Sequence, residues 1–145
     1  RKWLSEGKVV ICDRYVYSNV GYQCAKLNDE AAREELRKWI LGLEYEYNAI
    51  PKPDVSLFLD VPFAFTERKL LQEQREGDDR AYLNGQKDIH EQSMDLQRAV
   101  RQVYLDAAEY DENLHVVDCS TENNEMASPE DIFRRIEAVV SKYIE

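Results

Sequence analysis

Apolar residues along the chain follow two patterns, short continuous runs and longer stretches with helical spacing. The runs at 9–12, 55–61 and 114–119 are typical of strands buried on both faces of a parallel sheet. Because helical stretches alternate with these runs, we expect one α/β domain over residues 1–145, with a parallel sheet and flanking helices. Apolar positions three or four residues apart predict helices over 14–27, 29–48, 63–73, 88–109 and 128–143.

Proline, glycine and serine mark where these elements are expected to begin and end. Pro51 and Pro53 interrupt the second helix pattern, because proline cannot continue a helix. Residues 72–87 are polar and include two glycines, which predicts a loop. Ser128 followed by Pro129 and two acidic residues predicts the start of the last helix.

Each expected helix has an apolar face that we predict to be buried. These faces comprise Val16, Tyr17, Val20, Cys24 and Leu27 in the first helix, Leu36, Trp39, Ile40, Leu43 and Tyr47 in the second, and Leu96, Val100, Val103, Tyr104 and Ala107 in the fourth.

Composition narrows the class of protein. Hydrophobic residues make up 43% of the chain, and the formal net charge is −10, which disfavours partners such as nucleic acids and anionic membranes. No apolar run approaches the roughly 20 residues of a membrane span, and no signal-peptide pattern opens the chain. We therefore expect a soluble, cytoplasmic protein. Three cysteines without metal-site spacing, Cys12, Cys24 and Cys119, predict buried thiols.

Three polar segments follow the expected strands, at the edge where parallel α/β sheets bind ligands. They are Asp13–Arg14, Asp60–Pro62 and Asp118–Thr121. A carboxylate at a strand end suits Mg²⁺, which prefers hard oxygen ligands, and an arginine beside it suits a phosphate.

The helix after Asp13 has a polar and aromatic face opposite its apolar one. Arg14, Ser18 and Tyr22 are four residues apart and form one row, and Tyr15, Asn19 and Gln23 form the adjacent row. Such a face suits a nucleotide base and its sugar. A surface ion pair beside an ordinary solvated helix face explains the same residues, and the residues alone leave both interpretations open.

Two motifs resemble the thymidylate kinase family. The run DRYVYSNVGYQCAK is similar to the family's DR[YF]-x-x-S-x-x-[AG]-[YF] segment, and PKPD followed by VSLFLDVP resembles its P-[KR]-P-D-x-x-[FI]-x-L-D-V-P. The resemblance implies a parallel sheet of the P-loop nucleoside-monophosphate-kinase type. It also implies phosphoryl transfer from ATP to dTMP with Mg²⁺, and a homodimer that packs the helices over 14–27 and 29–48, with Trp39 as a candidate anchor.

The resemblance also assigns roles to individual residues. Asp13 organises Mg²⁺, and Arg14 grips the acceptor phosphate with support from Ser18. The 72–87 loop matches the lid over the donor phosphates. The remaining assignments are Asn19, Gln23, Tyr22 and Tyr82 for dTMP, Arg75 and Arg80 as catalytic lid arginines, and Arg68, Ser120 and Thr121 for the donor nucleotide.

One family motif does not occur in the sequence. No G-x-x-x-x-G-K-[ST] segment, which cradles donor phosphates, is present in the 145 residues. We therefore expect the chain to be the C-terminal part of such a kinase, with three of five strands, low stability and no activity alone. Alternatives are a non-catalytic nucleotide-binding or assembly module, a kinase for another monophosphate, and an interaction domain in which Asp13–Arg14 is only a salt bridge.

Overall fold

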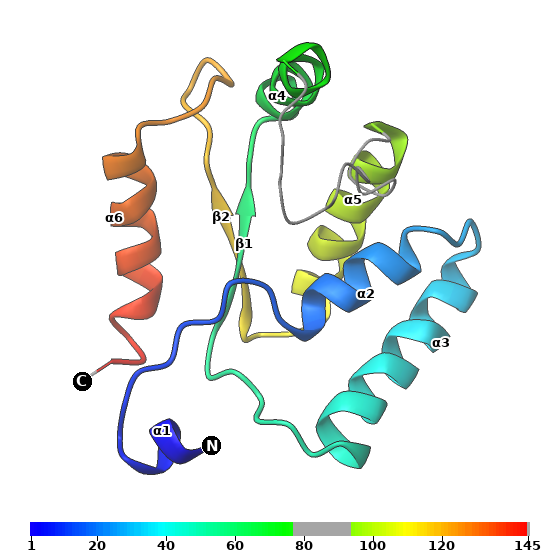
Figure 1. Ribbon diagram of the computed structural model, residues 1–145, viewed down its shortest axis with the longest axis vertical. Helices are drawn as coiled ribbons and strands as arrows, with labels where there is room; N and C mark the ends of the chain where they lie inside the picture. Colours follow the sequence, from blue (N-terminus) through cyan, green and yellow to red (C-terminus); the bar gives the residue numbers. More distant parts are fainter. Residues whose placement is uncertain (77–93, 145) are drawn as a thin grey trace.

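The computed structural model describes residues 1–76 and 94–144, and these form an α/β fold (Figure 1). Strands β1 (Ser56–Asp60) and β2 (Leu114–Asp118) pair in parallel, so the expected α/β class with a parallel sheet and flanking helices is confirmed. The helices are α1 (Lys2–Ser5), α2 (Val16–Cys24), α3 (Glu30–Leu41), the π-helix η1 (Gly42–Tyr47), α4 (Phe63–Glu76), α5 (Met94–Tyr110) and α6 (Pro129–Val140).

The prediction of a strand over residues 9–12 is wrong. In the described part of the chain these residues form no strand, and the segment leads from α1 to α2 as coil (Figure 1). The side chain of Ile11 is 92% exposed, and Cys12 is exposed rather than buried. The physical reason is that an extended apolar run becomes a strand only when a neighbouring strand takes its backbone hydrogen bonds.

Several helix boundaries also differ from expectation, including the ends of α2 at Cys24 instead of residue 27 and of α6 at Val140 instead of residue 143. Helix α2 begins at Val16 instead of residue 14, because Arg14 has a left-handed backbone (φ 63°) and Tyr15 is extended. Helix α4 continues through residues 72–76, where a loop was predicted. The segment 72–76 contains glutamine, glutamate and arginine, which favour helix. The rest of the predicted loop and the predicted helix start at 88 lie outside the described residues.

Other helix ends follow the expected chemistry. The predicted helix over 29–48 becomes α3 followed by η1, and Asp29 caps it by accepting a hydrogen bond from the Ala32 backbone N–H at 2.8 Å. Ser128 caps α6 by accepting from the Asp131 backbone N–H at 3.1 Å, with Pro129 in the first turn.

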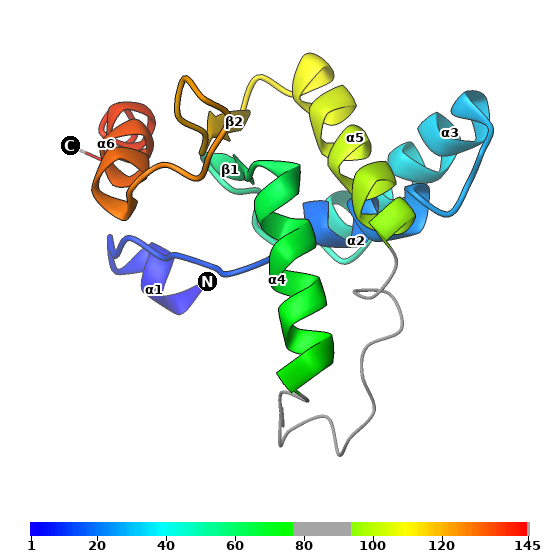
Figure 2. The same ribbon diagram turned by 90° about the horizontal axis from the view of Figure 1, so that it is seen from above.

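The core lies on both sides of the sheet. Helices α2, α3 and α5 pack together on one side, and α6 packs beside β2 on the other (Figures 1 and 2). The predicted apolar faces of α2 and α5 are confirmed, since Val20, Cys24, Val103 and Ala107 are all buried. The larger cluster comprises Val16, Val20, Cys24, Ala25, Ile40, Val100 and Val103.

The predicted face of the second helix is wrong at two positions. Ile40 is buried, but the Trp39 side chain is 61% exposed and Tyr47 is also exposed. The α3 face turned to α2 is narrower than the sequence pattern suggests.

Among the described helices, none is both long enough and apolar enough to cross a membrane.

Candidate functional site

The start of α2 carries an arginine held against an aromatic ring. Nη2 of Arg14 lies 3.2 Å from the Tyr22 hydroxyl oxygen, and its guanidinium carbon lies 5.3 Å from the Tyr22 ring centroid. Both distances suit a hydrogen bond and a cation–π contact. The Arg14 residue is exposed. The structure therefore brings together the first and last members of the predicted row, although Arg14 precedes the helix.

Ser18, the middle member of this row, contacts α5. The Tyr104 hydroxyl donates to Oγ of Ser18 across 3.4 Å, and the Tyr104 ring stacks on Phe58 of β1 with centroids 4.4 Å apart. The same ring packs so closely on Gly21 that a methyl group there would approach Cε2 of Tyr104 to 2.7 Å. Sequence reasoning gave Tyr104 only a core position, and nothing in its spacing marked this contact.

The second predicted row is less organised. Tyr15 donates from its hydroxyl to the Pro51 carbonyl at 3.0 Å, which joins the start of α2 to the predicted proline segment. Asn19 and Gln23 are exposed, and Gln23 accepts a hydrogen bond from Nζ of Lys26 at 3.3 Å. Neither residue is buried in this structure.

The carboxyl ends of β1 and β2 lie side by side, because Asp60 and Asp118 are register partners. Arg101 of α5 binds Asp60 through two parallel hydrogen bonds of 2.6 and 2.7 Å, and this interaction raises the pKa of Arg101. Asp118 accepts from the hydroxyl and backbone N–H of Ser120 at 2.7 and 2.8 Å, and these bonds hold its pKa below the ordinary range. Sequence reasoning missed Arg101, although its spacing of three residues from Tyr104 places both on one helix face.

The residues assigned to the donor nucleotide lie on two elements. Ser120 and Thr121 begin a tight loop after β2, in which Oγ1 of Thr121 accepts from the Glu125 backbone N–H at 3.2 Å. Nη1 of Arg135 donates to the carbonyls of Asp118 and Ser120 at 2.6 and 2.9 Å, which fixes this loop to α6. Arg68 is exposed on α4, and its Nε donates to the Ala64 carbonyl at 3.3 Å.

Three predicted residues have no described side chain. Arg75 falls in the backbone of α4, but its side chain lies outside the described residues. Arg80 and Tyr82 lie outside the described residues altogether.

Asp13, the predicted Mg²⁺ ligand, is an exposed carboxylate beside Arg14. Within residues 1–76 and 94–144, no three His, Cys, Asp or Glu side chains are grouped to hold a metal ion. A single carboxylate suits the way Mg²⁺ binds, with several waters and nucleotide phosphates, and does not suit an all-protein cage. The donor set therefore fits a Mg²⁺ ion that is held mainly by the nucleotide.

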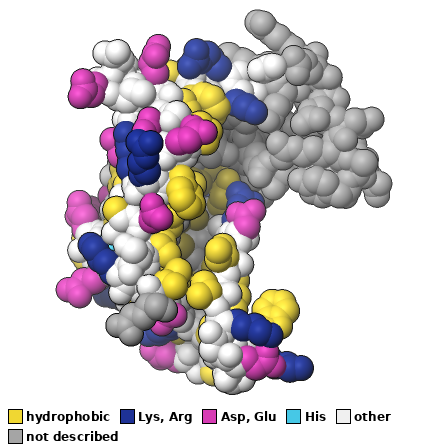
Figure 3. Space-filling view, turned by 90° about the vertical axis from the view of Figure 1, so that its left-hand side faces the viewer, with side chains coloured by type: hydrophobic (Ala, Val, Ile, Leu, Met, Phe, Trp, Pro, Cys, Tyr) yellow, Lys and Arg dark blue, Asp and Glu magenta, His cyan; other side chains and the backbone are white. Residues whose placement is uncertain are grey.

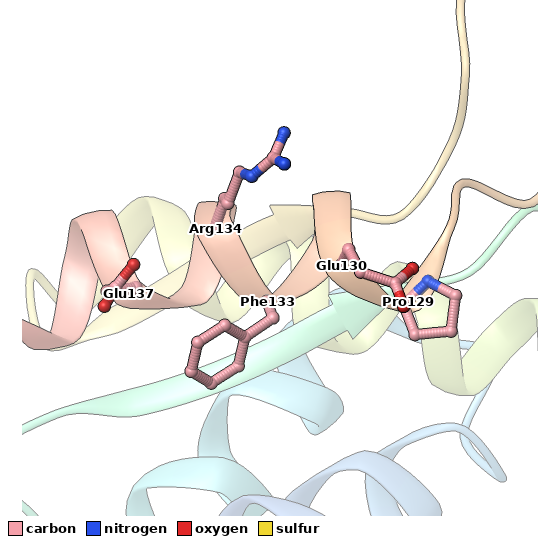
Figure 4. Close-up of a pocket in the computed structure, with 5 residues that line it drawn as sticks. All are labelled: Pro129, Glu130, Phe133, Arg134 and Glu137. Atoms are coloured by element: carbon pink, nitrogen blue, oxygen red, sulfur yellow. The ribbon is translucent and has the colours of Figure 1, made fainter.

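A shallow concavity lies on α6, on the other side of the sheet from α2. Pro129, Glu130, Phe133, Arg134 and Glu137 line it, and all five come from this one helix (Figure 4). None of these residues was predicted to bind a nucleotide. The Arg14–Tyr22–Ser18–Tyr104 group is therefore the stronger candidate site, because it combines an exposed cation with aromatic and hydroxyl groups.

Comparisons with known proteins agree with the two motifs. The family model described as thymidylate kinase matches residues 1–132. A probable thymidylate kinase of Pyrococcus horikoshii is 34% identical over 137 residues, covering 94% of this chain and 54% of the relative. A probable thymidylate kinase of Pyrococcus abyssi is 32% identical, again covering 94% of this chain and 54% of the relative. A thymidylate kinase of Ligilactobacillus salivarius is 32% identical, covering 81% of this chain and 50% of the relative. The chain spans about half the length of these relatives, and no solved structure gave a significant match.

Proposed function

This chain belongs to the thymidylate kinase family, and from that premise we propose that the protein transfers a phosphoryl group from ATP to dTMP. In this reaction an oxygen of the dTMP phosphate attacks the γ-phosphorus of ATP. A new phosphorus–oxygen bond forms while the bond to the β,γ-bridging oxygen breaks, and the products are dTDP and ADP. Thymidylate kinases are phosphotransferases.

The observation that carries the proposal is the contact of the Arg14 side chain with Tyr22, at a residue that is exposed. A guanidinium offers paired N–H donors that match phosphate oxygens. The aromatic ring under it lowers the freedom of the side chain, so less entropy is lost when a phosphate binds. We assign Arg14 and Ser18 to the acceptor phosphate, and Tyr22, Asn19, Gln23 and Tyr82 to the nucleoside.

The donor side involves residues that we expect around the carboxyl end of the sheet. We assign Arg68, Ser120 and Thr121 to the donor nucleotide, and Arg75 and Arg80 to the charge that develops on the transferring group. When ATP is bound, Mg²⁺ neutralises charge on its phosphates, and Asp13 would hold this ion through water.

We further propose that residues 1–145 alone do not complete the reaction. The sequence has no G-x-x-x-x-G-K-[ST] segment, whose backbone N–H groups and lysine bind donor phosphates. The chain by itself is then an acceptor-binding unit. Incubation of the purified chain, at its confirmed mass, with ATP, Mg²⁺ and dTMP should give no dTDP.

The acceptor assignment is tested by titrating the chain with dTMP and following binding by calorimetry or NMR. We expect dTMP to bind, dGMP and dCMP to bind more weakly, and Arg14→Ala to lower dTMP affinity about 10- to 100-fold, as for loss of a hydrogen bond to a charged group. Arg134→Ala, which removes an exposed arginine on α6 at the other side of the sheet, is the matched control. Equal affinity for all monophosphates would favour a kinase for another acceptor, and no effect of Arg14→Ala would favour an interaction domain.

We also propose that the protein self-associates through α2 and α3. The support is the Trp39 side chain, a large apolar group that is 61% exposed on α3. Aromatic side chains of this kind are enriched at protein interfaces.

A further inference from the structure

Helix α5 lies between the sheet and α2 and contacts both. On its sheet side, Arg101 binds Asp60 and Tyr104 stacks on Phe58, so two residues one turn apart on α5 hold two residues of β1. Phe58 and Asp60 are two positions apart in the strand and therefore face the same side of the sheet. This double contact fixes the Tyr104 ring in place.

The hydroxyl end of Tyr104 reaches α2 at the candidate site. It donates to Oγ of Ser18, and the ring edge fills the space that Gly21 leaves without a side chain. The oxygen–oxygen distance of 3.4 Å is longer than the 2.7–2.8 Å common for such bonds. Hydrogen bonds at functional sites are often long in the unliganded protein and shorten when the ligand binds.

We propose that Tyr104 is a positioning residue that acts through Ser18 on the phosphate of the acceptor nucleotide, an inference that rests on the proposed function. When the Ser18 oxygen accepts the hydrogen bond from Tyr104, the Ser18 hydroxyl hydrogen is directed elsewhere and is available to an anionic oxygen. Tyr104 thus orients Ser18 without touching the nucleotide itself.

The ionisation of Tyr104 agrees with this arrangement. Burial raises the pKa of Tyr104, while the hydrogen bond with Ser18 and the nearby charge of Arg14 lower it in part. The hydroxyl therefore keeps its proton at neutral pH and can donate a hydrogen bond.

The test compares Tyr104→Phe, Ser18→Ala and the double variant with the unaltered chain, using dTMP and thymidine as probes. Tyr104→Phe retains the ring that stacks on Phe58 and removes only the hydroxyl. Losing one hydrogen bond predicts an approximately three- to tenfold weaker dTMP affinity, with thymidine affinity unchanged because thymidine has no phosphate. Tyr110→Phe is the matched control, since Tyr110 is on the same helix and its side chain is 69% exposed.

A double-mutant cycle separates action through Ser18 from a general structural effect. If Tyr104 acts through Ser18, then Tyr104→Phe has no further effect on dTMP affinity in the Ser18→Ala background. Full additivity, unchanged dTMP affinity in Tyr104→Phe, or equal losses for dTMP and thymidine would each overturn the inference. Failure of the unaltered chain to bind dTMP would instead contradict the proposed acceptor site, and the inference with it.

Discussion

At the scale of single residues, Arg14 has an unusual backbone conformation, which among the described non-glycine residues it shares with Ala49 and Asn124. Its φ of 63° is in the left-handed region, which costs a residue with a side chain about 1–2 kcal/mol. Such conformations persist where the surrounding structure holds them, and they concentrate at functional sites. Here the conformation ends the preceding coil and lets the Arg14 side chain lie on Tyr22 two turns into α2.

Two substitutions separate the free-energy cost of the left-handed backbone at position 14 from the function of the Arg14 side chain. Arg14→Ala and Arg14→Gly both remove the guanidinium, so both should lose dTMP affinity. Glycine adopts the left-handed region without penalty, so Arg14→Gly should unfold with a free energy about 1 kcal/mol higher than that of Arg14→Ala. Urea unfolding of both variants measures this difference.

The matched control is Tyr15→Ala against Tyr15→Gly at the next position, where the backbone is extended. There the glycine variant should be no more stable than the alanine variant. An Arg14→Gly variant that unfolds more easily than Arg14→Ala would show that position 14 stores no such strain.

At the scale of elements, α5 connects parts of the protein that are distant in sequence. It binds β1 through Asp60 and Phe58, and α2 through Ser18 and Gly21. At its C-terminal end, Asp111 accepts a hydrogen bond from the Tyr17 hydroxyl of α2. Substitutions on α5 should therefore alter the candidate site and the sheet together.

The ion pair between Arg101 and Asp60 provides one measure of this connection. The Asp60 side chain is only 16% exposed, so Arg101→Ala leaves a mostly buried carboxylate without its partner. Because Arg101 itself is 42% exposed and screened by water, we expect a loss of about 1–2 kcal/mol in the free energy of unfolding. Lys38→Ala removes an exposed ion pair with Glu34 and should change stability by less than about 0.5 kcal/mol. Equal effects of the two substitutions in chemical denaturation would contradict this prediction.

Alkaline pH should weaken the contacts that join α2, η1 and α5. Burial raises the pKa of Tyr45 from 10.0 to about 12, and burial together with the Asp111 hydrogen bond raises that of Tyr17. Above pH 10 the unfolded chain loses tyrosine protons that the folded chain keeps, so the free energy of unfolding falls as pH rises from 10 to 12. Each tyrosine contributes at most about 1.4 kcal/mol per pH unit.

Denaturant unfolding at several pH values measures this slope. Tyr45→Phe should make it shallower, because phenylalanine has no proton to lose. Between pH 7 and 9 these two tyrosines should contribute no slope. An unchanged slope above pH 10 in the Tyr45→Phe variant would show that Tyr45 ionises alike in the folded and unfolded chain.

The pattern of apolar residues predicted most of these elements but not all of them. The runs at 55–61 and 114–119 became paired strands, and the capping residues Asp29 and Ser128 mark helix starts as expected. The run at 9–12 is at least as apolar but forms no strand, since pairing depends on a neighbouring strand and not on the run itself. Helical spacing likewise predicted that Trp39 is buried, but the packed face of α3 is narrower than the predicted apolar face and leaves Trp39 exposed.

The candidate site was predictable only where its residues lie close in sequence. The row spacing of Arg14 and Tyr22 anticipated their contact, although Arg14 precedes α2. Tyr104 and Arg101 were missed because their partners, Ser18 and Asp60, lie far away in sequence and meet them only through the packing of α5. Side chains from distant elements are placed by tertiary structure, which no local spacing encodes.

At the scale of the whole molecule, apolar side chains are exposed on both sides. On the α6 side, hydrophobic side chains form a band flanked by charged ones (Figure 3). The exposed apolar residues of α6 and β1 include Phe133, which is 61% exposed, and Leu59. On α3 the exposed large apolar side chain is that of Trp39. Exposed apolar patches of this kind mark surfaces that associate.

The proposed self-association through α3 is tested by placing a charge at Trp39. Trp39→Glu should lower the fraction of dimer in sedimentation equilibrium, because it buries a carboxylate in an apolar contact. Phe133→Glu is the matched control, since Phe133 is equally exposed but lies on α6. A dimer that persists in Trp39→Glu, or that is lost in Phe133→Glu alone, would show that the interface does not include α3.

The parallel pairing of β1 with β2 has a consequence for how the chain is made. Ser56 pairs with Leu114, so the backbone hydrogen bonds of the sheet join segments separated by all of α4 and α5. Contacts between segments so far apart form slowly, and synthesis proceeds from the N-terminus. While the ribosome is still making α5, β1 is already exposed as an apolar segment without its partner. The nascent chain is therefore most open to chaperone binding and to aggregation in the interval before β2 emerges.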